Sequence, residues 1–238
     1  MEHPLLFISI ILDTIGLPAQ GGESLLAQAL APHMQYSYLA IALTLILGKM
    51  GTSRQDMVPT GLQNIMEIFV GGLEDFITQQ VGDREKAIML FPMIATFGYL
   101  ILISNFLGLI PGFTSPTANI NITLGYTAIA IVAYHALGIR YHGLKYIKHF
   151  MGPIKIMAPF FLVVETFSHL GRILSLSIRL FGNMMSKELL LFIIFTLAGQ
   201  YLAPLPIMVL GVLVCIIQAF IFVVLPVSYC AEAMHEPH

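Results

Sequence analysis

The stretch PFFLVVETFSHLGRILSLSIRLFGNMMSKELLLFIIFT, residues Pro159–Thr196, decides what kind of protein this chain is. It is mostly apolar, and its 38 residues span roughly 57 Å as one helix, whereas the hydrocarbon core of a bilayer is about 30 Å thick. A typical tilt of about 20° does not absorb that excess. We therefore expect either a re-entrant hairpin bent at Gly171 or Gly182, or a long, strongly tilted helix. We favour the tilted helix, paired as a hairpin with the apolar stretch Pro206–Ala231.

Arg179 is a charged residue inside this apolar stretch. Its guanidinium does not lose its proton, and placing it at the centre of a bilayer costs roughly 2.5 kcal/mol or more. One interpretation is a polar contact between helices, in which a buried Arg pairs with a Glu. Further ionisable residues share the stretch: Glu165, His169, Arg172, Lys187 and Glu188. They favour an ion pathway instead.

The composition predicts an all-α integral membrane protein. The chain has 238 residues, of which 57% are hydrophobic and 10% charged, and its net charge is −2. Soluble domains carry about 25% charged residues. We expect one membrane domain over residues 1–238 with five transmembrane helices, near 34–50, 87–110, 120–139, 159–196 and 206–231. The segment 59–81 has apolar residues on one face and acidic residues on the other, which predicts an in-plane amphipathic helix beside a protein neighbour.

The positions of Lys and Arg predict the orientation. Eight of the eleven basic residues lie on one side: Lys49, Arg54, Arg84, Lys86, Arg140, Lys145, Lys148 and Lys155. Cytoplasmic loops carry such an excess, so we expect the N-terminus outside and the C-terminus in the cytoplasm. No basic residue precedes the first apolar run within Met1–Asp13, apart from the terminus itself, so we expect this segment to be retained rather than removed as a signal peptide.

Four sequence motifs carry a family resemblance. They are SIRLFGNMMSKE at Ser177–Glu188, SNFLGLIPG at Ser104–Gly112, PTANINITL at Pro116–Leu124 and IIQAFIF at Ile216–Phe222, with Glu165 upstream of the first. In order and spacing, over roughly residues 30–232, the chain resembles the bacterial F-type ATP synthase subunit a, the ATP synthase A chain family. The resemblance implies a stator subunit of the bacterial inner membrane that is not catalytic alone. Its implied partners are the c-subunit ring, the b subunits of the peripheral stalk, the rest of the synthase and membrane lipid.

The resemblance also implies a mechanism, in which Arg179 faces the ring between two aqueous half-channels. An opposite charge within about 4–6 Å lowers the pKa of a carboxylate by roughly 1–3 units, so Arg179 would promote deprotonation of the ring carboxylate. Its fixed charge would also block a direct proton leak. Lysine is a poorer choice, because it loses its proton when desolvated.

Site residues follow from the same resemblance, position by position. Asn183 and Gln218 resemble the polar residues near the arginine. Glu188 and Asn105 resemble residues of the outer half-channel, and on a helix Glu188 points about 180° away from Arg179. Glu165 and Ser175 resemble residues of the cytoplasmic side, which His169 is expected to join.

The chain departs from the family pattern at several positions. Gly211 stands where several relatives have a titratable residue, and Gly108 stands where some have Asp. We expect Lys187 to extend outward toward lipid headgroups. His135 reads as a core histidine with satisfied hydrogen bonds, and His142 as a loop residue that meets solvent or headgroups.

Other functions have less support in the sequence. A channel or secondary transporter predicts internal repeats or broken helices, and an intramembrane enzyme predicts a nucleophile or metal motif. ATP hydrolysis by this chain alone needs a phosphate-binding loop. None of these patterns is present. We expect no cofactor, no metal and no nucleic acid. Cys215 and Cys230 lie roughly 22 Å apart on one predicted helix, beyond disulfide reach. The coupling ion is left open between H⁺ and Na⁺, with H⁺ as the default.

Overall fold

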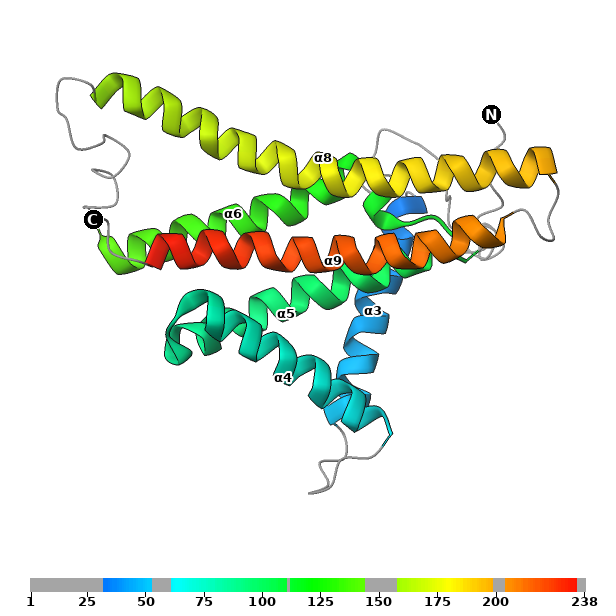
Figure 1. The fold of residues 1–238 in the computed structure, drawn as a ribbon, viewed down its shortest axis with the longest axis horizontal. Coiled ribbons are helices and arrows are strands. Elements are labelled where there is room, and N and C mark those ends of the chain that lie inside the picture. The colour runs from blue at the N-terminus through cyan, green and yellow to red at the C-terminus, as the bar shows by residue number, and fades with distance from the viewer. Residues whose placement is uncertain (1–31, 53–60, 111, 144–157, 199–203, 235–238) are drawn as a thin grey trace, which may run out of the picture.

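Helices are the only regular secondary structure in the described part of the chain. A computed structural model describes residues 32–52, 61–110, 112–143, 158–198 and 204–234. These residues form α3 (Pro32–Thr52), α4 (Leu62–Val81), α5 (Arg84–Leu107), the short 3₁₀ helix η1 (Pro116–Ala118), α6 (Ile120–His142), α8 (Ala158–Ala198) and α9 (Leu205–Met234), with no strand among them (Figure 1). The predicted all-α class is confirmed. The expectations for Met1–Asp13, Arg54 and the basic residues of 144–157 lie outside the described residues.

Four helices are long and apolar enough to cross a membrane: α5, α6, α8 and α9. They coincide with four of the five predicted spans and extend past the apolar windows at several ends. At the start of α5, for example, the Asp83 side chain accepts a hydrogen bond from the Glu85 N–H and caps a helix whose first turn is polar. The fifth segment also forms a helix, α3, but it is less apolar than the other four, so the fifth crossing stays a prediction.

Helix α8 is one unbroken helix of 41 residues. It continues through Gly171 and Gly182, so the alternative of a re-entrant hairpin within this stretch is wrong. The second half of α8 runs beside α9, and its first half inclines away from α9 (Figure 1). The inclination of α8 to the membrane stays a prediction.

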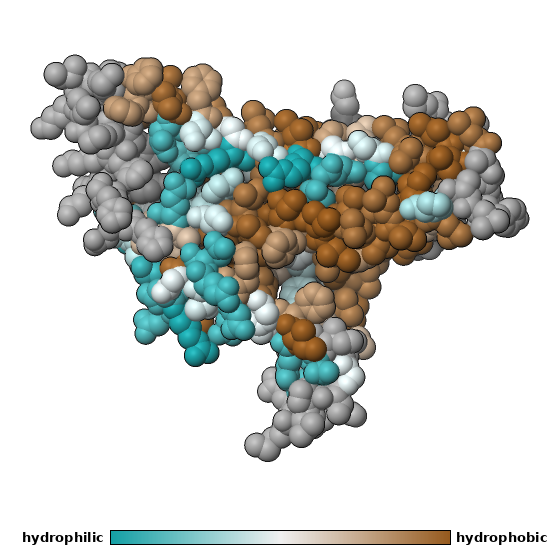
Figure 2. All heavy atoms as spheres, viewed as in Figure 1, coloured by the Kyte–Doolittle hydropathy of each residue, from teal (hydrophilic) through white to brown (hydrophobic). Residues whose placement is uncertain are grey.

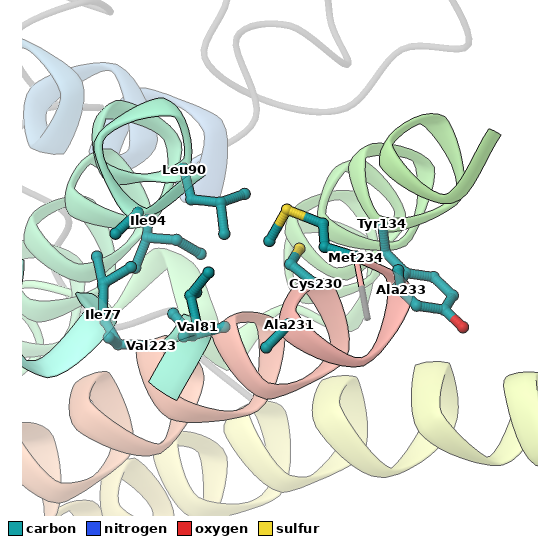
Figure 3. Close-up of a cluster of buried hydrophobic side chains, with 12 residues drawn as sticks. Ile77, Val81, Leu90, Ile94, Tyr134, Val223, Cys230, Ala231, Ala233 and Met234 are labelled. Carbon is teal, nitrogen blue, oxygen red and sulfur yellow. The ribbon is translucent and has the colours of Figure 1, made fainter. Parts of the chain in front are cut away.

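Helix α9 is the central element of the packing, because it contacts α4, α5, α6 and α8. Toward its C-terminal end, Val223, Cys230 and Met234 belong to one buried cluster with Ile77 of α4 and Ile94 of α5 (Figure 3). In the middle of α9, a second buried cluster joins this helix to α5, α6 and α8. Its members include Phe97, Ile101, Ala130, Leu176, Leu180, Met184, Cys215, Ala219 and Phe222. Lipid tails are as apolar as these side chains, so close packing rather than transfer from water holds the helices together.

Helix α4 is the predicted amphipathic helix, and part of its apolar face is already covered. Ile77 and Val81 are buried against α5 and α9, whereas Ile68 and Phe69 nearer its start are exposed. The helix ends at Gly82, whose φ of 74° is the left-handed conformation that closes a helix and favours glycine. The chain then reverses into α5, and Arg84 pairs with Glu74 at 3.3 Å.

The close contact between α5 and α9 generates the first prediction. A Cβ atom at Gly98 would lie 2.9 Å from Cγ2 of Val223, so Gly98→Leu forces these helices apart. We expect a loss of about 1–3 kcal/mol of stability, the usual cost of overpacking, seen as a lower unfolding temperature in detergent. The matched control is Gly125→Leu on α6, where a Cβ meets no atom within 4 Å. Equal unfolding temperatures for the two variants would contradict this packing.

Candidate functional site

Arg179 lies on α8 between a buried face and an exposed one. Leu176, Leu180 and Met184 are buried in the cluster that joins α8 to α6 and α9, whereas Ile178 is half exposed. The Arg179 guanidinium donates to the Ser175 hydroxyl at 3.1 Å, one turn back on the same helix. Within the described part of the chain, no carboxylate lies at ion-pair distance from Arg179. The chain as described therefore leaves this charge without an anionic partner.

Apolar surface lies on both sides of the polar residues of α8. Leu174, Met185, Leu189 and Ile193 on α8 are exposed, as are Val209, Leu213, Ile216 and Phe220 on α9. Figure 2 shows hydrophilic residues as a band along α8 with apolar surface on either side. Such a surface suits a lipid-embedded face or a membrane-embedded partner.

Glu188 belongs to a hydrogen-bonded network at the opposite end of α8 from Glu165. Its carboxylate accepts a hydrogen bond from the backbone N–H of Ser115. The Ser115 hydroxyl lies 2.6 Å from the Thr117 hydroxyl, which donates to Oδ1 of Asn105, also at 2.6 Å. Asn105 is completely buried, and its Nδ2 has no partner among the described residues. The structure thus connects the two residues expected to line one entry region, Glu188 and Asn105, through Ser115 and Thr117.

Lys187 points inward, so the expectation that it extends to the lipid headgroups is wrong. Only 7% of it is exposed, and its ammonium donates to the backbone carbonyl of Asn105 at 3.3 Å. The Cys215 thiol donates to the same carbonyl, also at 3.3 Å. The physical reason is space at Gly211, because a Cβ there would lie 3.3 Å from Cδ of Lys187. The lysine stem occupies the volume beside a residue that has no side chain.

A cavity of about 170 Å³ opens beside Glu188. Its walls are residues 108–110 and 112–114, which follow α5, together with Leu191, Phe192 and Phe195 of α8 and Met208 of α9. Gly108 lets the loop approach, because a Cβ at this position would lie 2.6 Å from Cβ and 3.1 Å from the backbone N of Ser115. A side chain at Gly108 does not fit this arrangement.

A second group of charged residues lies toward the start of α8. His169 and Glu165 pair at 3.2 Å, one helical turn apart. Arg172 pairs with Glu232 of α9 at 3.1 Å and stacks over the ring of Tyr229 at 4.8 Å. Along the helix, Arg179 is roughly 21 Å from Glu165 and roughly 13 Å from Glu188. It therefore separates two polar groups on the same helix.

Comparison with known proteins identifies the family. A family model described as ATP synthase A chain matches residues 34–231. The chain belongs to this family. It is 49% identical to ATP synthase subunit a of Desulfotalea psychrophila and 46% identical to that of Syntrophobacter fumaroxidans. It is also 42% identical to that of Geobacter sulfurreducens, and each of these alignments covers the whole of both chains.

Family membership fixes the broad role of the chain. ATP synthase subunit a is the proton-translocating component of the membrane sector and is not catalytic alone. Together with the four helices that are able to span a bilayer, it makes this chain a multi-pass membrane protein within an F-type ATP synthase.

The predicted site residues divide into those with a contact in the structure and those without one. Glu188 with Asn105, Glu165 with His169, and Arg179 with Ser175 are brought together. Asn183 is half-buried and Gln218 is buried on α9, and among the described residues neither forms a hydrogen bond with Arg179. Their roles stay predictions.

Sequence reasoning missed several members of these groups. Ser115 directly precedes the quoted motif PTANINITL, and Thr117 lies within it, but neither residue carried a role there. Glu232 is an acidic residue in the last turns of α9, and this position near the end of an apolar helix is a usable signal for an ion pair such as the one with Arg172. His142 is the last residue of α6 rather than a loop residue, and its Nε2 lies 3.0 Å from the Ala233 carbonyl.

Gly108→Ala tests whether the loop approach holds Glu188 in place. The added Cβ displaces the Ser115 backbone, so we expect the hydrogen bond to Glu188 to be lost and ATP-driven proton pumping in vesicles to fall by about tenfold. Gly125→Ala, at an open helical position, is the control and is expected to pump at the wild-type rate. Wild-type pumping by an assembled Gly108→Ala complex would count against this role for the loop.

Proposed function

We propose that this chain forms two aqueous half-channels against a rotating ring of c subunits, with Arg179 as the barrier between them. The observation that carries the proposal is the position of Arg179. Its guanidinium has no carboxylate within ion-pair distance in the described chain, and it lies between the Glu188 network and the Glu165 group. The missing anion is then supplied by the partner.

The charge of Arg179 accounts for two tasks: it promotes deprotonation of the ring carboxylate, and it blocks direct proton flow between the half-channels. A carboxylate of the ring that comes within about 4–6 Å of Arg179 is stabilised in its ionised form and releases its proton. As the ring turns, that carboxylate leaves and another takes its place. Because a guanidinium keeps its proton, Arg179 itself does not pass protons from one half-channel to the other.

The outer half-channel is assigned to Glu188, Asn105 and the hydroxyl groups between them. The cavity beside Glu188 provides room for water, and the chain Ser115, Thr117, Asn105 provides hydrogen-bonding groups that lead into the protein. The buried ammonium of Lys187 lies next to this chain and balances the charge of Glu188 when Glu188 is ionised. Gln218 and Asn183 are assigned to the surroundings of Arg179.

The inner half-channel is assigned to Glu165, His169 and Ser175. Ser175 touches Arg179, and Glu165 is about a third exposed, so the group extends from the arginine toward the start of α8. Arg172, by contrast, fits the simpler role of a polar contact between helices, because Glu232 satisfies its charge within the chain. The two arginines of α8 are thus assigned different tasks on the basis of their partners.

The finer topology completes the proposal. We assign five crossings, with the N-terminus outside, the C-terminus in the cytoplasm and α4 in the plane of the membrane. The exposed Ile68 and Phe69 on α4 are suited to a neighbouring subunit, for which the b subunits of the peripheral stalk are the candidates.

Replacement of Arg179 is the decisive experiment. Arg179→Ala is expected to abolish ATP synthesis driven by a proton gradient in reconstituted vesicles, because the ring carboxylate loses the cation that favours its ionised form. Arg84→Ala is the matched control, since Arg84 is an exposed arginine whose ion pair with Glu74 contributes little. Proton-driven synthesis by the Arg179→Ala complex at a wild-type rate would rule out the barrier role.

Copurification tests the proposed partner. An affinity tag on this chain is expected to retain a small, strongly hydrophobic ring-forming subunit in mild detergent. Phe220→Glu on the exposed face of α9 places a charge in that contact and is expected to reduce the recovered ring strongly. Val132→Glu, on an exposed position of α6, serves as control, and an equal loss of the ring in both variants would place the contact elsewhere.

A further inference from the structure

Two histidines from different helices meet beside the residues assigned to the inner half-channel. His135 comes from α6 and His169 from α8, and their ring centroids are 5.0 Å apart with the planes inclined by 56°. The tilted ring of Tyr134, also on α6, packs against both, with its centroid 4.8 Å from that of His135 and 5.6 Å from that of His169. Figure 3 shows the Tyr134 hydroxyl pointing away from the other labelled side chains. His135 is half-buried, and its ring packs against those of Tyr134 and His169.

Charged groups surround this pair on each helix packed against it. On α8, the Glu165 carboxylate lies 3.2 Å from Nε2 of His169, and Arg172 acts electrostatically on both histidines. On α9, Glu232 holds Arg172 in an ion pair at 3.1 Å, and Tyr229 lies under its guanidinium. One carboxylate therefore lies against His169 directly, while the neighbouring cation is paired with another carboxylate.

Such an arrangement favours one shared proton rather than two. Histidine is the side chain whose unperturbed charge change falls in the physiological pH range. Two imidazolium ions at this separation repel each other, whereas a single imidazolium next to Glu165 is stabilised. We propose that His135 and His169, with Glu165, form a relay that holds one proton and passes it between the Arg179 region and the cytoplasmic end of α6.

The positions of the neighbouring polar groups agree with a path. Ser175, which touches Arg179, is six residues beyond His169 and so roughly 9 Å along α8. In the other direction, His142 follows His135 by seven residues on the same face of α6, roughly 10 Å farther on. Its Nε2 lies 3.0 Å from the Ala233 carbonyl, at the end of α6. His135 thus connects the polar residues of α8 to the end of α6.

Each step in this relay is a simple proton transfer. A protonated imidazole gives its N–H proton to a neutral imidazole nitrogen or to an intervening water, and the positive charge moves with it. No electron is transferred and no further reactant is needed. The inference rests on the proposed half-channel function and adds His135 as a proton-carrying residue.

The test compares ATP-driven proton pumping by the whole complex in inverted vesicles, whose cytoplasmic face meets the medium. His135→Phe keeps an aromatic ring against Tyr134 and His169 but removes both nitrogens. The ratio of variant to wild-type rate at each pH cancels the pH dependence of the rest of the complex. We expect a loss of about threefold or more near pH 7.5, and near-wild-type pumping at about pH 5.5, where protons in the medium reach Glu165 directly.

Two comparisons separate a relay from a packing contact. The double variant that combines His135→Phe and His169→Phe is expected to pump no more slowly than the slower single variant, because the two histidines act in one step. Tyr134→Phe changes the same ring cluster without removing a histidine. The ratio of its pumping rate to the wild-type rate is expected to be the same at every pH. Should His135→Phe fail to assemble, His135→Gln is measured in the same way.

The relay would be overturned if the assembled His135 variant pumped at the wild-type rate at every pH. It would also be overturned if the ratio of variant to wild-type rate did not change with pH. Arg179→Ala in the same vesicles keeps the two proposals apart. If Arg179→Ala abolishes coupling while the His135 variant has a flat ratio, only the relay fails. If Arg179→Ala leaves coupling intact, the half-channel function fails, whatever the histidine variants show.

Discussion

The fixed positive charge of Arg179 is the constraint on which the rest of this structure depends. A guanidinium in a membrane-spanning helix stays ionised, and the described chain places only the Ser175 hydroxyl, not a carboxylate, within reach of it. Arg172 on the same helix shows the contrast, because Glu232 satisfies its charge across the α8–α9 contact. One arginine joins two helices, and the other has no carboxylate at ion-pair distance among the described residues.

Small residues set the shape of the outer polar network. Gly108 allows the Ser115 backbone to approach and reach Glu188, and Gly211 leaves the space that the Lys187 stem fills. The Ser115 hydroxyl then lies 2.6 Å from the Thr117 hydroxyl, and the Lys187 ammonium reaches the Asn105 carbonyl at 3.3 Å.

The group around His169 is built from residues of three helices. Glu165 and His169 come from α8, His135 from α6 and Glu232 from α9, and the rings of Tyr134 and Tyr229 pack among them. The group therefore depends on how α6, α8 and α9 pack together. Titratable side chains gathered in this way suit proton transfer better than permanent ion pairs do.

The sequence by itself determined the helices and the order of the polar residues along them. Apolar length and helical period predicted α4, α5, α6, α8 and α9 to within a few residues. The resemblance placed His169 with Glu165, and the structure pairs them at 3.2 Å. Only the tertiary structure decided the direction of Lys187, the pairing of His135 with His169 and of Arg172 with Glu232, and the link from Glu188 to Asn105. Local periodicity fixes which face of a helix a residue occupies. The direction of a long side chain, however, depends on the space that other helices leave, and Gly211 leaves such a space for Lys187. Contacts between segments that are distant in the sequence have no local signal.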